Sequence, residues 1–337
     1  MSSSNFITRR DFLKLSSAAF AWSMLPRSLR RANFNAPASL GRISIGWGQP
    51  VRVEPKLSAK VVAYKKYDDV IPLYDALEGE APWPSNPIWF QTDGGFIHSA
   101  YVQPVENTPS SNPLTSIDKP GVWTQVCVPI AESRSRPDSP YVARKLYYGT
   151  VYRAIAAAQD AKGDWWYQLQ EGIAYSPGPY VPAWSVRPLS EGEVSPLSPD
   201  RTDKRIEIDI ARQVLTCFEG DTPVFSTRTA SGLSGTITPK GEHHVVRKNF
   251  TSYMIGGEGA GYYNLPGVAF PSYFTWSGIA VHGTYWHNDF GRPKSHGCVN
   301  VSNEAALFVF RWTTPAVPYD QSSLSVKAGE GTLIRVI

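Results

Sequence analysis

Cysteine is scarce in this sequence: the 337 residues contain only Cys127, Cys217 and Cys298. No Cys-x-x-Cys pair and no His-Glu-x-x-His segment occurs, so the ligand spacings that are typical of zinc sites are missing. Cys127 and Cys217 lie in apolar segments far apart in the chain, which favours two buried thiols over a disulfide. We therefore expect no metal centre and no cofactor.

The sequence also lacks a long hydrophobic run and a basic body. The apolar stretch near the N-terminus, residues 15–25, has 11 residues, whereas a helix needs about 20 to span a bilayer. The formal net charge is +4, but residues 1–31 carry six basic residues and one acid, so the rest of the chain sums to −1. Nucleic-acid binding needs a basic surface on the folded part of a protein, so the main argument for nucleic acid as a partner is removed, and we expect none.

The basic N-terminus has its own explanation. Residues 8–14, Thr-Arg-Arg-Asp-Phe-Leu-Lys, precede the apolar stretch and resemble a twin-arginine export signal. Ala36-Pro37-Ala38 has the small-x-small pattern of a cleavage site, which predicts a signal peptide over residues 1–38 and a mature start near Ser39. The resemblance implies the twin-arginine export machinery as a partner and a location in the periplasm or cell wall, with no stable transmembrane span after cleavage.

Proline, glycine and aromatic residues are abundant, with 28 Pro, 27 Gly, 17 Tyr, 14 Phe and 11 Trp. This composition is typical of short strands joined by turns. Strand-like alternation occurs over residues 41–106 and recurs over 120–190, and each half closes on an aromatic-valine pair shortly before a proline, Tyr101-Val102 and Tyr180-Val181. Both halves weakly resemble bacterial Src-homology-3-like modules, and the sequence leaves open whether they bind the cell wall or pack against the rest of the chain.

The C-terminal part reads as a β domain with one short helix. Residues 205–210 alternate in the manner of a half-buried strand with its isoleucines inward. Ser302 can cap a helix that Pro315 would limit. Residues 245–274 are rich in glycine and aromatics and form either a long loop or, as the family resemblance given below implies, a flap over the substrate. We favour the flap, because long ordered loops in compact domains are usually functional.

These patterns predict a mainly β protein in several parts. The expected order is a signal peptide (1–38), a first small β-barrel module (39–106), a linker (107–119), a second small β-barrel module (120–190), a linker (191–202) and a C-terminal domain (203–337).

Residues 279–301 gather three of the six histidines and one of the three cysteines. Cys298 is the candidate nucleophile, because a thiolate is strongly nucleophilic and a nearby imidazole is its usual activator. His282 follows an apolar, strand-like run and is the candidate base. Gly297 removes side-chain bulk beside the sulfur, and backbone N–H groups near residues 296–298 would stabilise a developing oxyanion. This arrangement suits acyl transfer.

A zinc site is the competing interpretation of the same stretch. His282, His287, His296 and Cys298 all carry possible zinc ligands. Their spacing matches no standard ligand pair, so we favour the nucleophile and expect no metal.

The residues then become recognisable as a family pattern. Val-His-Gly-Thr at 281–284 and Ser-His-Gly-Cys-Val-Asn at 295–300 resemble the signature of the L,D-transpeptidases, the YkuD-type cell-wall cross-linking enzymes. The resemblance covers residues 203–337 and includes Thr-Pro-Lys-Gly at 238–241. It implies a C-terminal β-sandwich with a short helix.

The resemblance also implies roles for single residues. Cys298 would attack the donor peptide, His282 would take its proton, and the backbone carbonyl of Gly283 would hold the imidazole in the right tautomer. Tyr285 and Trp286 would lie beside the substrate. The implied substrate pocket is completed by Ser295, His296, Gly297 and Asn300.

The implied function is a peptidoglycan L,D-transpeptidase that joins a donor and an acceptor stem peptide through a Cys298 thioester. Two alternatives stay open. With water as the acceptor, the same chemistry gives an L,D-carboxypeptidase that trims stem peptides. With a silent site, the chain is a cell-wall-binding protein.

Overall fold

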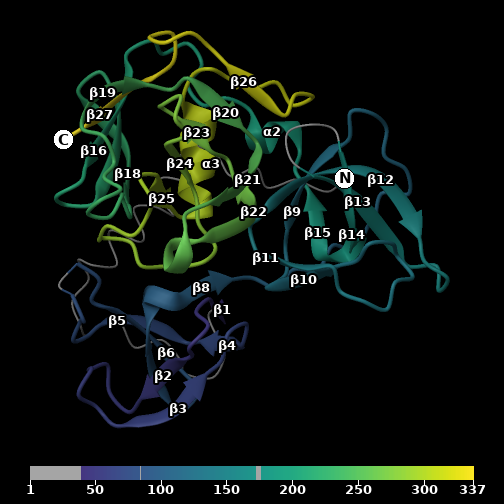
Figure 1. Ribbon diagram of the computed structural model, residues 1–337, viewed down its shortest axis with the longest axis horizontal. Coiled ribbons are helices and arrows are strands. Elements are labelled where there is room, and N and C mark those ends of the chain that lie inside the picture. The colour runs from purple at the N-terminus through teal and green to yellow at the C-terminus, as the bar shows by residue number, and fades with distance from the viewer. Residues whose placement is uncertain (1–38, 84, 172–175) are drawn as a thin grey trace, which may run out of the picture.

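The computed structural model of the chain describes residues 39–83, 85–171 and 176–337, and is mainly β, as the sequence predicts (Figure 1). The predicted export signal, residues 1–38, lies outside the described residues. Among the residues that are described, no helix is long and apolar enough to cross a membrane.

Residues 39–105 form two small sheets, which we call the first β unit (lower part of Figure 1). Their shared core is built from alternate residues of the strands, among them Ile43, Val51, Ile97 and Val102. The sheets have the strand orders β4-β1-β8 and β3-β2-β7-β6-β5. The elements are β1 (Ser39–Ile43), β2 (Gln49–Arg52), β3 (Val61–Lys65), β4 (Val70–Leu73), β5 (Asp75–Glu78), β6 (Ile88–Thr92), β7 (Gly95–His98), the 3₁₀ helix η2 (Ser99–Tyr101) and β8 (Val102–Val105).

Residues 122–188 form the second β unit, a five-stranded sheet with the order β14-β13-β12-β9-β15 and the hairpin β10-β11. Trp123 of β9 belongs to the hydrophobic core of the C-terminal domain and stacks on Phe250, with ring centroids 4.4 Å apart. The second unit therefore packs directly on that domain. Its elements are β9 (Val122–Val126), β10 (Ile130–Ser133), β11 (Arg144–Tyr147), β12 (Val151–Gln159), β13 (Trp165–Glu171), β14 (Ser176–Pro182), the 3₁₀ helix η3 (Ala183–Ser185) and β15 (Val186–Pro188).

The C-terminal domain has two five-stranded sheets that share one core with helix α3 (Asn303–Trp312). The sheets have the orders β18-β17-β16-β27-β19 and β25-β24-β23-β20-β26, and β21 pairs with β22 in a hairpin. The short helix α2 (Glu191–Val194) precedes them. The remaining elements are β16 (Lys204–Asp209), β17 (Val214–Glu219), β18 (Thr222–Arg228), β19 (Gly241–His244), β20 (Arg247–Asn249), β21 (Thr251–Gly256), the 3₁₀ helix η4 (Gly259–Gly261), β22 (Tyr263–Ala269), β23 (Ser272–Tyr273), β24 (Ala280–Gly283), β25 (Val299–Val301), β26 (Ser323–Ser325) and β27 (Leu333–Val336).

Both ends of helix α3 are capped by polar side chains. The Ser302 side chain accepts from the Ala305 N–H at the N-terminus, as the sequence predicts. At the other end, two buried lysines bind carbonyls that the helix leaves unpaired. Lys204 Nζ donates to the Trp312 carbonyl at 2.8 Å, and Lys248 Nζ donates to the Thr313 carbonyl at 2.7 Å. The helix is therefore fixed against both sheets.

Cys127 and Cys217 are buried free thiols, which confirms that prediction. Strand β1 was not among the predicted strands. In β1 the reason is visible: Arg42 is only 1% exposed, and a buried arginine breaks the alternation from which strands are recognised.

Candidate active site

His282 lies in β24, and Cys298 immediately precedes β25, the strand that pairs with β24 in parallel. In this pairing His282 is opposite Asn300, so these two side chains lie on the same face of the sheet. Cys298 is carried by the turn that leads into the strand beside that of His282. In the described residues the Cys298 thiol donates to the Gly278 carbonyl at 3.7 Å rather than to His282.

The tautomer of His282 follows from its one polar contact. Nδ1 lies 2.9 Å from the Gly283 carbonyl oxygen, and a carbonyl only accepts, so Nδ1 carries the proton. Nε2 is left with its lone pair. Burial lowers the pKa of His282 to about 4, which keeps the imidazole neutral at pH 7. A neutral imidazole with a fixed tautomer can act as a base.

Cys298 is partly exposed. Burial raises its pKa to about 11, although a hydrogen bond with the Ala280 backbone opposes this shift. The thiol is therefore protonated at pH 7, and the resting site consists of two neutral groups. Such a thiol needs a base to become a nucleophile.

The turn that carries Cys298 is held by side-chain hydrogen bonds. Ser295 Oγ donates to the Cys298 carbonyl and accepts from the Gly297 N–H at 3.1 Å. Thr238, in the 238–241 turn that the resemblance singled out, donates to the Gly297 carbonyl at 2.8 Å. The Gly297 N–H is thus already engaged. Of the N–H groups expected to meet an oxyanion, this one is not available.

Gly297 itself is required by the backbone. Its φ is +112°, and a Cβ there would lie 3.3 Å from Ile279 Cδ1. Both the left-handed backbone and the close neighbour favour glycine.

The predicted flap is an ordered hairpin of β21 and β22. Near its tip, the ring of Tyr263 lies 5.2 Å from that of His296 between centroids. His296 is exposed, and a charged Cys298 would raise the pKa of Tyr263 beyond the effect of burial. The hairpin tip therefore lies beside the nucleophile turn.

The two predicted substrate aromatics lie in different environments. The Trp286 ring centroid is 5.8 Å from that of His282, and Trp286 is partly exposed. Tyr285 is only 4% exposed and stacks on Tyr147 of the second β unit, 5.4 Å away between centroids. Its carbonyl accepts from Arg42 of the first β unit at 2.6 Å. Tyr285 thus lies where all three parts of the chain meet.

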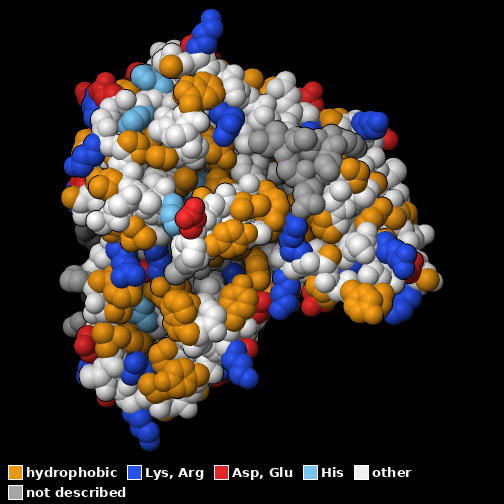
Figure 2. Space-filling model, in the orientation of Figure 1, with side chains coloured by type: hydrophobic (Ala, Val, Ile, Leu, Met, Phe, Trp, Pro, Cys, Tyr) orange, Lys and Arg blue, Asp and Glu red, His pale blue; other side chains and the backbone are white. Residues whose placement is uncertain are grey.

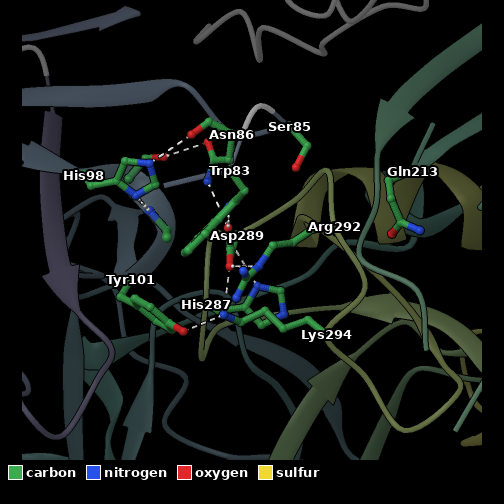
Figure 3. Close-up of polar contacts among 12 residues, drawn as sticks. Trp83, Ser85, Asn86, His98, Tyr101, Gln213, His287, Asp289, Arg292 and Lys294 are labelled. Atoms are coloured by element: carbon green, nitrogen blue, oxygen red, sulfur yellow. Dashed lines mark hydrogen bonds and ion pairs between the residues drawn. The ribbon is translucent and has the colours of Figure 1, made fainter. Parts of the chain in front are cut away.

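Sequence reasoning missed two residues of the connection between β24 and β25 as site residues (Figure 3). His287 was considered only as a zinc ligand, and it contacts Asn300 through Nε2, 3.0 Å from the Asn300 carboxamide. Asp289 is fully buried and binds both the first β unit and two cations of its own segment. The available signal was the concentration of histidines between the two strands.

The Asp289 carboxylate has a complete set of partners. Oδ1 accepts from Trp83 Nε1 and Asn86 Nδ2, both at 3.1 Å. Oδ2 accepts from Arg292 Nε and Lys294 Nζ, both at 2.8 Å. Burial alone would raise the pKa of Asp289, but Lys294, Asn86 and Arg292 together hold it below its usual value. The carboxylate is therefore charged and fixes this segment to the first β unit.

No group of three or more His, Cys, Asp or Glu side chains in the described part of the chain is placed to hold a metal ion.

Comparison with known proteins agrees with the motif. Residues 203–336 match the YkuD family, described as the L,D-transpeptidase catalytic domain. The C-terminal part of this chain is therefore an L,D-transpeptidase-family domain. No curated protein matches the chain.

Several solved structures are similar over part of the chain. A cysteine-to-serine mutant of the Enterococcus faecium L,D-transpeptidase is 23% identical, with a TM-score of 0.32; the match covers 41% of this chain and 51% of that one, about half its length. An L,D-transpeptidase from Mycobacterium smegmatis is 15% identical, with a TM-score of 0.33 and coverage of 54% and 98%. One from Xylanimonas cellulosilytica is 26% identical, with a TM-score of 0.27 and coverage of 42% and 64%. At these TM-scores, the assignment rests on the family match.

Proposed function

We propose that this protein is a peptidoglycan L,D-transpeptidase that works through a Cys298 thioester. The observation that carries the proposal is the placement of His282 in β24 and of Cys298 immediately before β25, the parallel neighbour of β24, with Nε2 of His282 free of the proton. The family match supports the class of reaction. The neutral resting pair needs no metal or nucleotide to start acyl transfer.

The first half-reaction forms the thioester. Cys298 Sγ bonds to the carbonyl carbon of an L-centre that precedes a D-residue in a tetrapeptide stem, while His282 Nε2 accepts the thiol proton. When the tetrahedral intermediate collapses, the C–N bond breaks and the imidazolium returns the proton to the leaving D-amino acid. The Gly283 carbonyl stabilises the imidazolium by accepting from Nδ1.

The second half-reaction transfers the acyl group. An amine of a neighbouring stem attacks the thioester carbonyl, its proton passes to His282 Nε2, and the C–S bond breaks. The thiolate then recovers the proton. Trp286 and His296 are the proposed substrate contacts, whereas the burial of Tyr285 and Asn300 favours a structural role for those two residues.

The test is mass analysis of muropeptides after incubation with the purified protein, with Cys298→Ala and with His282→Ala. Direct cross-links made only by the wild type are the expected result. Trimmed tripeptides without cross-links would instead identify a carboxypeptidase. Identical products from the wild type and Cys298→Ala would contradict both enzymatic readings and leave a wall-binding protein.

We further propose export by the twin-arginine machinery and a division of the chain into domains at residues 39–106, 120–190 and 203–337.

Hydrophobic side chains gather over the first β unit (lower part of Figure 2), where Trp47, Tyr64 and Tyr67 are exposed. This surface is the candidate for wall binding, which a sacculus pull-down with Trp47→Ala tests.

Replacing Arg9 and Arg10 with lysine should retain the precursor in the cytoplasm. Continued export of this variant would contradict the proposed twin-arginine signal.

A further inference from the structure

His287 is buried, with 3% of its surface exposed, and both of its ring nitrogens have polar contacts. Nδ1 accepts from the Asp289 backbone N–H at 3.1 Å. Burial and the charge of Lys294 lower the pKa of His287 to about 3, so the ring is neutral at pH 7. A neutral ring whose Nδ1 accepts must carry its proton on Nε2. The tautomer of His287 is thus the opposite of that of His282.

This tautomer fixes the orientation of the Asn300 side chain. The Asn300 carboxamide lies 3.0 Å from His287 Nε2, and because Nε2 donates, the contact requires the carboxamide oxygen. The NH₂ group then takes the other carboxamide position, which is buried and receives no hydrogen bond from the described part of the chain, as a donor at that position requires. Asn300 faces the same side of the sheet as His282.

The first β unit completes the arrangement. The Asp289 backbone N–H donates to His287 Nδ1, and the Asp289 carboxylate accepts from Trp83 and Asn86. The same segment makes a backbone bond from the Asn288 N–H to the Ala100 carbonyl at 2.8 Å. Figure 3 shows Asp289 between the residues of the first β unit and the cations of its own segment. The position of His287 therefore depends on a part of the chain about 200 residues away in sequence.

We propose that His287 is a positioning residue of the acyl-transfer site, which fixes the orientation of the Asn300 carboxamide beside His282, and that the first β unit holds His287 through Asp289. The inference rests on the proposed function of Cys298. His287 touches neither substrate nor sulfur in this account, and it acts through Asn300.

The tautomer is tested without any activity. In protein labelled with ¹⁵N-histidine, the His287 signal is assigned by its loss in His287→Gln. At pH 7 we expect a protonated Nε2 and an unprotonated Nδ1 for His287, and the reverse for His282. A His287 ring protonated at Nδ1 would overturn the proposal even if the protein proves to be an active transpeptidase.

The coupling to Asn300 is tested by a double-mutant cycle on the cross-linking rate, with unfolding followed in parallel. His287→Phe keeps a ring but loses both hydrogen bonds, and kcat/KM should fall about tenfold, the value of one buried hydrogen bond. His287→Gln, which keeps one donor and one acceptor, should recover most of this loss.

In the Asn300→Ala background, His287→Phe should cost little further, because the residue it orients is gone. An equal loss in both backgrounds would mean that His287 only supports the fold, and would overturn the proposal. If the wild type makes no Cys298-dependent product, the proposed function fails, and the ¹⁵N measurement still decides the tautomer.

Discussion

At the scale of single residues, Cys298 is a neutral thiol and His282 is a neutral imidazole at pH 7. The pKa of Cys298 is raised to about 11 and that of His282 is lowered to about 4, in both cases mainly by burial. A thiolate-imidazolium pair at rest would need these values in the opposite order. In the proposed mechanism, the proton transfer therefore accompanies substrate attack.

The reactivity of Cys298 without substrate should follow from these values. We expect its alkylation by iodoacetamide to accelerate about tenfold for each pH unit between pH 7 and 10, because only the thiolate reacts. Mass spectrometry of the modified peptide measures the rate, and Cys298→Ala reports any labelling of Cys127 or Cys217. A rate that is already constant at neutral pH would contradict a neutral resting pair.

The two buried histidines also predict how stability depends on pH. Their folded-state pKa values, about 4 for His282 and about 3 for His287, lie below the unfolded value of about 6.5. The unfolded chain therefore binds more protons below pH 6.5, and stability is lost as the pH falls from there. Between pH 7 and 5 the loss should be about 2 kcal/mol for each histidine.

Urea unfolding at both pH values measures this loss, and His287→Gln should reduce it by about 2 kcal/mol, the contribution of that histidine. An unchanged pH dependence in His287→Gln would show that His287 is protonated equally in both states.

At the scale of elements, the turn that carries Cys298 is held by several hydrogen bonds. Ser295 closes it from within, and Thr238 fixes it to the neighbouring loop. Because Gly297 has a positive φ beside Ile279, the turn has little freedom to accept a side chain.

Gly297→Ala should therefore lower both stability and activity. The positive φ costs about 1 kcal/mol, and displacement of the adjacent sulfur should reduce turnover about 100-fold. Gly163→Ala is the matched control, since Gly163 has φ +88° and open space around it. It should lose similar stability and keep its activity. Equal activity in both variants would contradict the role of the turn.

The elements differ in how far the sequence predicts them. β16 and α3 follow from local patterns, since the alternation of residues 205–210 and the Ser302 cap are contained within each element. The flap was expected as a loop and forms a hairpin, because its strands pair across glycine-rich residues whose periodicity is weak. The short strands β10 and β15 depend on partners elsewhere in the chain.

The same distinction applies to the site. Cys298 and His282 belong to a compact motif, so the two neighbouring strands to which they are joined could be predicted. The surroundings of Tyr285, His287 and Asp289 could not, because their partners lie in the first and second β units. No local pattern records such contacts.

At the scale of the whole molecule, Arg42 connects the three parts of the chain. Its guanidinium donates to the Tyr285 carbonyl, pairs with Asp68 at 3.0 Å and lies 4.0 Å from the centroid of the Tyr147 ring. Arg42 is 1% exposed. The N-terminal units are therefore packed against the catalytic domain.

Arg42→Met should destabilise the protein by about 3 kcal/mol, because it removes the donor to the Tyr285 carbonyl and leaves Asp68 with Lys145 as its remaining cation partner. Thermal or urea unfolding followed by tryptophan fluorescence measures the change. Lys56→Met removes an exposed cation that pairs with Glu54 and should have no measurable effect. Comparable unfolding curves for the two variants would mean that the units do not stabilise one another.

The connection between β24 and β25, residues 284–298, is also the segment on which the first β unit packs. A chimera that fuses residues 203–337 to a foreign N-terminal module would leave the Asp289 carboxylate and the Tyr285 ring without the partners that now cover them. Such a transplant can regain its geometry only if the donor module supplies an indole or amide N–H at the same place. The C-terminal domain therefore cannot be exchanged on its own. We expect the residues of the two N-terminal β units that contact it to change in evolution together with their partners in the C-terminal domain.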